Sequence, residues 1–178
     1  KTPAQSIKKI LSCIAVHGTH CKNKYPQPML IIRKTGNTDK DFQQLVAKLD
    51  EELRIRDGDD HAFYAALNKT GDIRYVIVAY ENDLPVGCGS LRAFSTGTME
   101  VKRMYVELDN RGRGIATAIL KELESWALEL GYTKLILETG INQPETIKHY
   151  QKNQYCTIPN YGKYAGMITS VCFEKILS

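Results

Sequence analysis

The sequence predicts an α/β domain with a mixed central sheet of about six to seven strands flanked by helices. Strand-like runs joined by polar turns dominate the first part, and strand-like and helix-like segments then alternate. The run "KLILET" at 134–139 is almost continuously apolar, which is typical of a buried strand parallel to its neighbour. A length of 178 residues is that of about one domain with one core.

The first half of this domain is expected to hold a strand, two helices and a hairpin. "MLIIR" at 29–33 predicts the first strand. Apolar residues at helical spacing then predict a helix that ends near "RDGDD" (Phe42, Leu45, Val46, Leu49 and Leu53). A shorter helix is expected over 61–68. Strands at 74–80 and 85–94, joined by the polar turn "ENDL", complete the hairpin.

The second half alternates strands and helices. "MEVKRMYV" at 99–106 predicts a strand that is entered from the turn "STGT". After a turn rich in arginine and glycine, one apolar stripe predicts a helix closed by Gly131 (Ile115, Ile119, Leu123, Trp126, Ala127 and Leu130). The strand at 134–139 follows, and "NQP" then opens another helix with Pro144 in its first turn. "GMITSVCFEKI" at 166–176 predicts the last strand.

Composition and charge argue against several classes of protein. The 43% hydrophobic and 25% charged residues are those of an ordinary soluble domain. A net charge of +4 suits an anionic ligand but falls short of a nucleic-acid-binding face, so no nucleic-acid partner is expected. No apolar run approaches the ~18 residues of a membrane helix, so no membrane partner is expected either. Five scattered cysteines without a CxxC pair favour the cytoplasm.

Residues 1–28 differ in composition from the rest, and we expect a leader or extra N-terminal segment before a compact domain over 29–178. Within this segment, "CIAVHGTHC" holds four residues of metal-ligand type (Cys13, His17, His20 and Cys21). Four ligands in so short a stretch are an unusual spacing for zinc. An extra helix or a leader is therefore the preferred interpretation, and no metal is expected.

The turn at 111–114 connects the strand at 99–106 to a long apolar helix. A helix N-terminus has unpaired amides and a partial positive charge, glycines allow a ligand close to the backbone, and arginines add forked donors. These features favour a site for a diphosphate; the alternative is a solvated turn that uses Gly112 for a bend. A Walker loop is unlikely without GK[ST], and the third glycine of a dinucleotide fingerprint is missing.

The run Arg111-Gly112-Arg113-Gly114-Ile115-Ala116 matches the pattern R/Q-x-x-G-x-G/A. It resembles the acetyl-CoA signature of the GNAT superfamily of N-acetyltransferases. The resemblance covers about residues 30–176 and is strongest over 99–156. It implies the GNAT fold, acetyl-CoA as co-substrate, and a pyrophosphate bound by the backbone of these six residues.

The same resemblance implies that the pantetheine arm lies along the backbone of Met104, Tyr105 and Val106. Downstream, "QPETIKHYQKNQY" resembles the family motif N-x-x-A-x-x-x-Y-x-x-x-G-F/Y, with Tyr150 on its tyrosine and Tyr155 on its last aromatic residue. Three positions depart from that motif (Gln143, Thr146 and Gln154). Gln143 stands where the family has asparagine, and we expect it at the cofactor site.

Acetyl transfer to an amine requires two proton movements: an ammonium with a pKa of about 10 loses a proton, and the leaving thiolate gains one. Glu100 resembles, in its spacing from Arg111, the glutamate base of protein-acetylating GNAT members; the alternative is an ordinary strand glutamate. Tyr150 is the candidate acid for the thiolate; the alternative is a core tyrosine beside Ile147.

A ping-pong route through an acyl-cysteine would use Cys88 or Cys156. The pattern offers neither cysteine a histidine and carboxylate partner to activate it. Direct transfer is therefore the expected route.

The acceptor pocket is the least determined feature. In the resembling family, the first two helices and the loop before the last strand form its walls. Asp57, Asp59 and Asp60 in the first region would either attract a cationic amine or cap the next helix. Tyr161 and Tyr164 in the second would either enclose a small ligand or pack in the core.

The sequence thus predicts an enzyme that moves acetyl from acetyl-CoA directly to a primary amine of a small molecule or amino acid. One alternative is an acetyltransferase for lysines or N-termini of proteins or peptides. The other is a non-catalytic sensor that binds acyl-CoA. A homodimer is compatible with the chain, and the acceptor stays open.

Overall fold

The computed structural model describes residues 29–58, 61–67 and 70–178. Within them, seven strands form one sheet in the order β1-β2-β3-β4-β5-β7-β6. Neighbouring strands are antiparallel except β4 and β5, which are parallel. This confirms the mixed sheet. The strands are β1 (Leu30–Thr35), β2 (Tyr75–Glu81), β3 (Leu84–Ser95), β4 (Thr98–Val106), β5 (Lys134–Gly140), β6 (Cys156–Ile158) and β7 (Ser170–Ile176).

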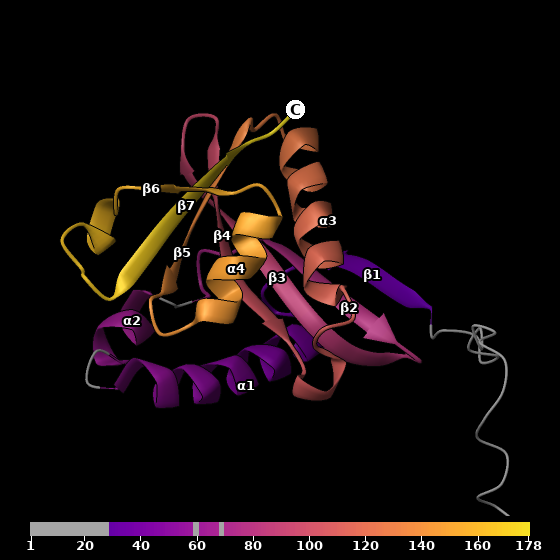
Figure 1. Cartoon of the computed structure of the whole chain (residues 1–178). Helices are drawn as coiled ribbons and strands as arrows, with labels where there is room; N and C mark the ends of the chain where they lie inside the picture. Colours follow the sequence, from indigo (N-terminus) through magenta and orange to yellow (C-terminus); the bar gives the residue numbers. More distant parts are fainter. Residues whose placement is uncertain (1–28, 59–60, 68–69) are drawn as a thin grey trace, which may run out of the picture.

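Helices cover both faces of the sheet (Figure 1). They are α1 (Lys40–Asp57), α2 (His61–Leu67), α3 (Ile115–Glu129) and α4 (Pro144–Lys152), with short 3-10 turns η3 (Leu108–Asn110) and η4 (Gly162–Tyr164). Apolar residues of α3 and α4 form the larger core with β2, β3, β4 and β5, while α1 packs on the opposite face. The sheet therefore separates an α3/α4 side from an α1/α2 side.

Most boundaries expected from the sequence agree with the structure, with two differences near the C-terminus. The last strand begins at Ser170 rather than at 166, because η4 and a left-handed Gly166 (φ 81°) form turns before it. The three-residue strand β6 was not expected. It pairs with β7 over Cys156–Ile158 and is too short to leave an alternating pattern.

The parallel strands β4 and β5 pair only where they begin. Thr98–Glu100 of β4 lie beside Lys134–Ile136 of β5, and the paired register ends there. On its other side, β4 carries a bulge against β3, next to Arg103, whose φ of 57° is uncommon for a residue other than glycine. The two strands consequently diverge in the middle of the sheet, and this gap is where the predicted site residues gather.

Candidate functional site

A cavity of about 350 Å³, here called the turn cavity, lies between β4, the 111–114 turn and α4. Nine of the sequence-predicted cofactor residues line it (Met104, Tyr105, Val106, Arg111, Gly112, Gly114, Ile115, Ala116 and Gln143). The structure therefore brings the arginine–glycine turn, the end of β4 and the start of α4 to one place.

The start of α3 is open toward a ligand. Gly114 is its N-cap in a left-handed conformation (φ 84°), and no side chain caps the helix. A Cβ atom built on Gly112 or Gly114 would meet no heavy atom within 4 Å. The first amides of α3 have no side-chain cap, and the two glycines leave open space beside them. Both features suit the negative charge and the size of a diphosphate. The chain itself thus fits the pyrophosphate of a coenzyme A ester.

Carboxylates hold both arginines of the turn. Arg111 donates to Val106 O at 2.8 Å and pairs with Glu52 of α1, with its Nη2 2.6 Å from Glu52 Oε2. The hydrogen bond from Arg111 is the largest cause that lowers the pKa of the Glu52 carboxyl. Arg113 donates to both carboxylate oxygens of Glu81 on β2, at 2.8 and 2.9 Å. The Arg113 guanidinium therefore anchors the turn to the sheet, whereas Arg111 borders the turn cavity.

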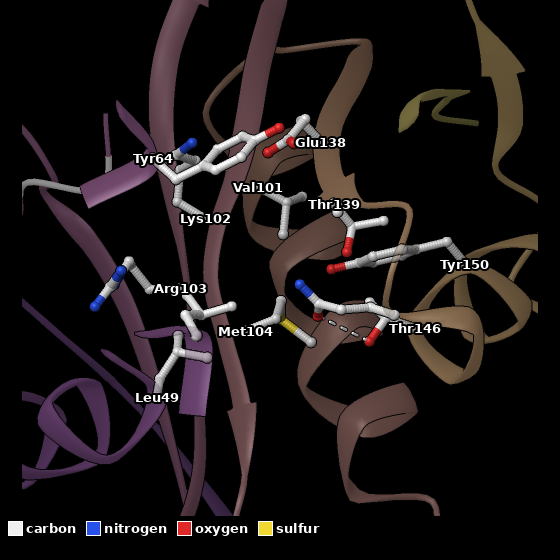
Figure 2. A pocket seen from close by; sticks show the side chains of 13 residues that line it. Leu49, Tyr64, Val101, Lys102, Arg103, Met104, Glu138, Thr139, Thr146 and Tyr150 are labelled. Atoms are coloured by element: carbon white, nitrogen blue, oxygen red, sulfur yellow. Dashed lines mark hydrogen bonds between the residues drawn. The ribbon is translucent and has the colours of Figure 1, made fainter. Parts of the chain in front are cut away.

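A second hollow of about 110 Å³, here called the splay cavity, fills the gap between β4 and β5 (Figure 2). Lys102 and Met104 line it from β4, Glu138 from β5, Tyr64 from α2 and Tyr150 from α4. Tyr150, Met104, Gln143 and Thr146 line the turn cavity as well. The splay cavity therefore continues the turn cavity toward the α1/α2 side of the sheet.

Tyr150 is buried with its hydroxyl directed into the splay cavity (Figure 2). Its ring packs against Tyr155 and Phe173, with ring centroids 5.7 and 5.9 Å away. Burial, and then the charge of Glu138, raise the pKa of this phenol well above its usual value. Tyr150 is thus both a core residue, as one interpretation of the sequence held, and a protonated hydroxyl in the cavity.

Glu100 lies on the α1/α2 side of β4 and is 1% exposed. Its carboxylate pairs with Arg92 and lies 3.5 Å from Lys102 Nζ, and Tyr161 OH donates to it at 2.9 Å. Glu100 lines a third hollow, of about 470 Å³ and here called the outer cavity, together with Arg92, Tyr161 and Tyr164. The two predicted catalytic residues therefore border different cavities.

Comparison with known proteins identifies the architecture around these cavities. The family model described as Acetyltransferase (GNAT) family matches residues 40–155, which include the turn and Tyr150. The chain belongs to the GNAT family of acetyltransferases. It is accordingly an acyltransferase, as the sequence predicted.

Relatives of this GNAT acetyltransferase are found among characterised and solved proteins. An IAA acetyltransferase of Azospirillum brasilense is 33% identical over 143 residues, covering 76% of this chain and 93% of the relative. The crystal structure of a putative acyl-CoA N-acyltransferase from Klebsiella pneumoniae has 28% identity and a TM-score of 0.71, covering 84% of this chain and 99% of that one. A GNAT structure from Elizabethkingia anophelis with acetyl-CoA bound (19% identity, TM-score 0.61, 83% and 98% covered) shares the fold.

Three charged residues of this GNAT acetyltransferase's splay cavity were not predicted from the sequence: Lys102, Arg103 and Glu138. Glu138 was read as part of the apolar run "KLILET", in which a single carboxylate is the only signal available. Lys102 donates to Tyr164 OH at 2.7 Å, and burial lowers the pKa of its ammonium despite the nearby Glu100. Their placement depends on the divergence of β4 and β5, which local sequence does not specify.

The tyrosines of the loop before β7 contact charged residues as well as one another. Tyr161 and Tyr164 meet edge to face with centroids 5.6 Å apart, and they hydrogen-bond to Glu100 and Lys102 respectively. The two rings therefore pack on each other, and enclosure of a small ligand by them stays a prediction, because they also border the outer cavity.

The thiol of Cys88 is unsuited to an acyl-cysteine route. Cys88 is fully buried, its Sγ–H donates to Arg103 O at 3.4 Å, and burial raises its pKa to about 12. A protonated, enclosed thiol is a poor nucleophile at neutral pH. Cys88 is therefore disfavoured as an acyl carrier, Cys156 is exposed at the surface, and direct transfer stays a prediction.

Some predictions concern residues that the structure does not describe. The Cys/His group of residues 1–28 and the pair Asp59 and Asp60 lie outside the described residues, as does the side chain of Asp57. Among the described residues, no cluster of three or more histidine, cysteine, aspartate or glutamate side chains could hold a metal ion. No helix in the described ranges is long and apolar enough to cross a membrane.

Proposed function

We propose that this protein transfers the acetyl group of acetyl-CoA directly to a primary amine of a small molecule or amino acid. The observation that carries the proposal is the position of Tyr150, which lines both the turn cavity and the splay cavity. Solved proteins of the same fold contain coenzyme A or acetyl-CoA. A donor whose pyrophosphate lies on the turn and whose arm follows Met104–Val106 would lead toward this hydroxyl.

In this proposal, bound acetyl-CoA supplies the thioester. The amides at the start of α3 and the Arg111 guanidinium bind its pyrophosphate, while Gln143 borders both cavities beside the arm. A tyrosine hydroxyl carries its proton at neutral pH, so Tyr150 can donate that proton to sulfur as the carbon–sulfur bond breaks. Glu100 stays a predicted base for the amine, acting directly or through water.

An acceptor screen tests this proposal. The wild-type protein is incubated with acetyl-CoA and single acceptors, and released thiol is measured. The acceptors are amino acids, polyamines, aminoglycosides, lysine peptides and, because a relative is named for it, IAA. We expect release with at least one small primary amine. Release with lysine peptides alone would favour a protein acceptor, and calorimetric binding of acetyl-CoA without any release would favour the sensor.

A further inference from the structure

Lys102 brings a primary amine to the border of the splay cavity, the hollow that also receives the hydroxyl of Tyr150. Figure 2 shows the two residues on opposite borders of this cavity, Lys102 on β4 and Tyr150 on α4. Among the described residues that line the cavity, Lys102 is the one primary amine. We infer that Lys102 is a self-acetylation site: without an acceptor, the protein transfers the acetyl group of bound acetyl-CoA to Lys102 Nζ. This inference rests on the proposed function, from which it takes the acetyl donor.

The other polar side chains around the cavity are poorer nucleophiles than an amine. The Arg103 guanidinium stays protonated in a protein, and threonine hydroxyls need an adjacent base. Burial raises the pKa of the Tyr150 phenol, so its phenolate is scarce. Burial lowers the pKa of the Lys102 ammonium, although the charge of Glu100 opposes this shift. Lys102 is therefore the side chain that most readily offers a neutral nitrogen to a thioester.

The contacts of Lys102 Nζ supply a route for its proton. Glu100 Oε1 lies 3.5 Å from Nζ, and Nζ donates to Tyr164 OH at 2.7 Å. These partners engage two of the three N–H bonds of an ammonium group. When Glu100 takes a proton, the nitrogen gains a lone pair, while the hydrogen bond to Tyr164 keeps the amine in place. Arg92 and Tyr161 in turn hold the Glu100 carboxylate, so the proton acceptor is fixed beside the amine.

The transfer balances without a further reactant. Glu100 takes one proton from the Lys102 ammonium, and the freed nitrogen forms its bond to the acetyl carbonyl carbon as the carbon–sulfur bond breaks. Tyr150 gives its proton to the departing sulfur, and the second proton of the nitrogen restores the phenol. Glu100 then releases its proton to solvent, so the net products are acetyl-lysine, a thiol and one proton.

An acetyl group on Lys102 would block the place where an acceptor amine meets the donor. The splay cavity measures about 110 Å³, and the new group would fill part of it from β4. Acetylation also removes the positive charge that pairs with Glu100. The turn cavity stays open, so the modified protein still binds acetyl-CoA but no longer turns over. Self-acetylation thus stops the enzyme when acetyl-CoA is present and the acceptor is not.

Mass spectrometry with deuterated acetyl-CoA tests the inference. The wild-type protein is incubated with this donor and no acceptor, and cleavage after glutamate releases residues 101–107, in which Lys102 is the single lysine. Deuterium distinguishes the label from any acetyl group already on the protein. Lys48 of α1, whose side chain is 58% exposed, reports chemical acetylation in solution. Lys175 of β7 pairs with Glu124 at 2.8 Å, lines none of the three cavities and reports a carboxylate-paired amine away from the site.

We expect Lys102 to gain label at least about 10²-fold faster than Lys48 and Lys175, the gain that a positioned acid and base provide. Gly114→Asp, which should not bind acetyl-CoA, should reduce the rate at Lys102 to that at Lys175 and leave Lys48 unchanged. Gly131→Asp, at the other end of α3, should label Lys102 as the wild type does.

The variant Lys102→Arg keeps a cation for Glu100 and lacks the primary amine. It should therefore lose the release of thiol that the wild type shows without an acceptor. Lys175→Arg is the matched control and should keep that release. In the wild type, the kcat for the best amine of the acceptor screen should fall in proportion to the label at Lys102.

Two results would overturn the inference. One is a Lys102 that stays unlabelled in a protein that acetylates a small amine, in which case the proposed function stands. The other is wild-type labelling of Lys102 in a Gly114→Asp protein that calorimetry shows not to bind acetyl-CoA. If Gly114→Asp does not fold, excess coenzyme A replaces it as a competitor and must slow labelling of Lys102 but not of Lys48. Rapid labelling of Lys102 with no small amine acetylated would refute the proposed acceptor and support the inference.

Discussion

At the residue scale, Tyr150 combines two roles: its ring packs in the core, and its hydroxyl lies in the splay cavity. A buried phenol in contact with Tyr155 and Phe173 stabilises the core whatever its hydroxyl does. The hydroxyl, however, lies in the splay cavity and stays protonated because burial and Glu138 disfavour the phenolate. A substitution that keeps the ring and removes the hydroxyl therefore isolates the chemical role.

Tyr150→Phe should lower kcat by about 10²–10⁴-fold, because the thiolate then leaves without a proton. Acetyl-CoA affinity and the melting temperature should change little, since the ring and its packing remain. An acyl donor with a more acidic thiol should partly restore turnover. Steady-state kinetics and calorimetry measure these effects, and Tyr155→Phe, a buried neighbour on the core side, is the control. Wild-type turnover in Tyr150→Phe would remove the acid role.

Glu100→Gln should chiefly reduce stability. The carboxylate is 1% exposed and pairs with Arg92 and the 7% exposed Lys102, so its removal leaves the buried Lys102 without this partner, whereas Arg92 keeps its ion pair with Asp72. Breaking such a buried pair costs about 3 kcal/mol of unfolding free energy. Denaturant unfolding measures this loss. A stable Glu100→Gln protein whose activity deficit vanishes as the pH nears the amine's pKa would instead support Glu100 as the base.

The sequence predicted Tyr150 and Glu100 as site residues but not Glu138, and the difference has a physical reason. Tyr150 belongs to a motif of fixed spacing, so its position relative to the turn follows from the chain itself. Glu100 was found in the same way, but its partner Arg92 depends on the register of β3 and β4, where the two residues face each other. Glu138 lines the splay cavity only because β4 and β5 diverge beside it, and it accepts a hydrogen bond from Ser170, which lies 32 positions away in the sequence.

At the element scale, the junction of β4 and α3 forms the turn cavity through backbone shape. Gly112 and Gly114 have φ angles of 75° and 84°, which side chains other than glycine adopt at a cost. On the sheet, Gly89 of β3 lets Met104 approach: a Cβ there would lie 2.5 Å from Met104 Sδ and 2.8 Å from Ile119 of α3. Glycines thus set both the turn and the packing of α3 on the sheet.

Gly114→Asp should abolish measurable acetyl-CoA binding, because it places a carboxylate where the pyrophosphate is expected. Gly131→Asp is a matched control: Gly131 follows the other end of α3 with a φ of 83°, and its Cβ would also meet open space. Both variants should lose about 1–2 kcal/mol of stability from backbone strain. Calorimetry should find wild-type affinity in Gly131→Asp alone. Equal affinities in both variants would exclude the turn from the site.

The elements that the sequence predicted well are those with long local patterns. The hairpin of β2 and β3 follows from two apolar strands around Asn82 and Asp83, both with positive φ angles. The parallel strand β5 follows from its apolar run. Short β6 and the late start of β7 depend instead on strand pairing and on η4, which leave weak local signals.

At the scale of the whole molecule, the two substrates of the proposed reaction would approach the gap between β4 and β5 from different cavities. The donor would enter along the turn cavity, which α1, the 111–114 turn and α4 border, and the acceptor from the side of α2, whose Tyr64 lines the splay cavity together with Glu138. The gap between β4 and β5 is then the place where they meet, with Tyr150 and Glu138 bordering it from different elements. No local pattern predicts such an arrangement, because it depends on where two strands cease to pair.

Ion pairs connect α1 to the turn and to α4 around the mouth of the turn cavity. Glu52 of α1 binds Arg111, and Arg56 of α1 pairs with Glu145 of α4. Glu52 itself lines the turn cavity. Its carboxylate pairs with the Arg111 guanidinium, which would otherwise bind the pyrophosphate. The ion pair between Glu52 and Arg111 should therefore compete with binding of the donor.

Glu52→Gln should tighten acetyl-CoA binding about two- to fivefold, since a partly exposed ion pair is worth up to about 1 kcal/mol. The same substitution should change acid stability. Because the folded pKa of Glu52 is lowered, chiefly by the hydrogen bond from Arg111, its stabilisation is present above its unfolded pKa of about 4.3. That stabilisation is lost as pH falls through the folded value. Glu52→Gln should lack this acid-side loss.

Calorimetry and thermal unfolding between about pH 3 and pH 7 test both effects, a range that spans the usual glutamate pKa. Glu51→Gln is the control, because Glu51 precedes Glu52 on α1 and pairs with Arg54 at 2.7 Å, an exposed contact within the helix. Its affinity for acetyl-CoA should equal that of the wild type. If Glu52→Gln binds acetyl-CoA no more tightly than Glu51→Gln does, the pyrophosphate does not displace Glu52 from Arg111, and Arg111 serves only to attach the turn to α1.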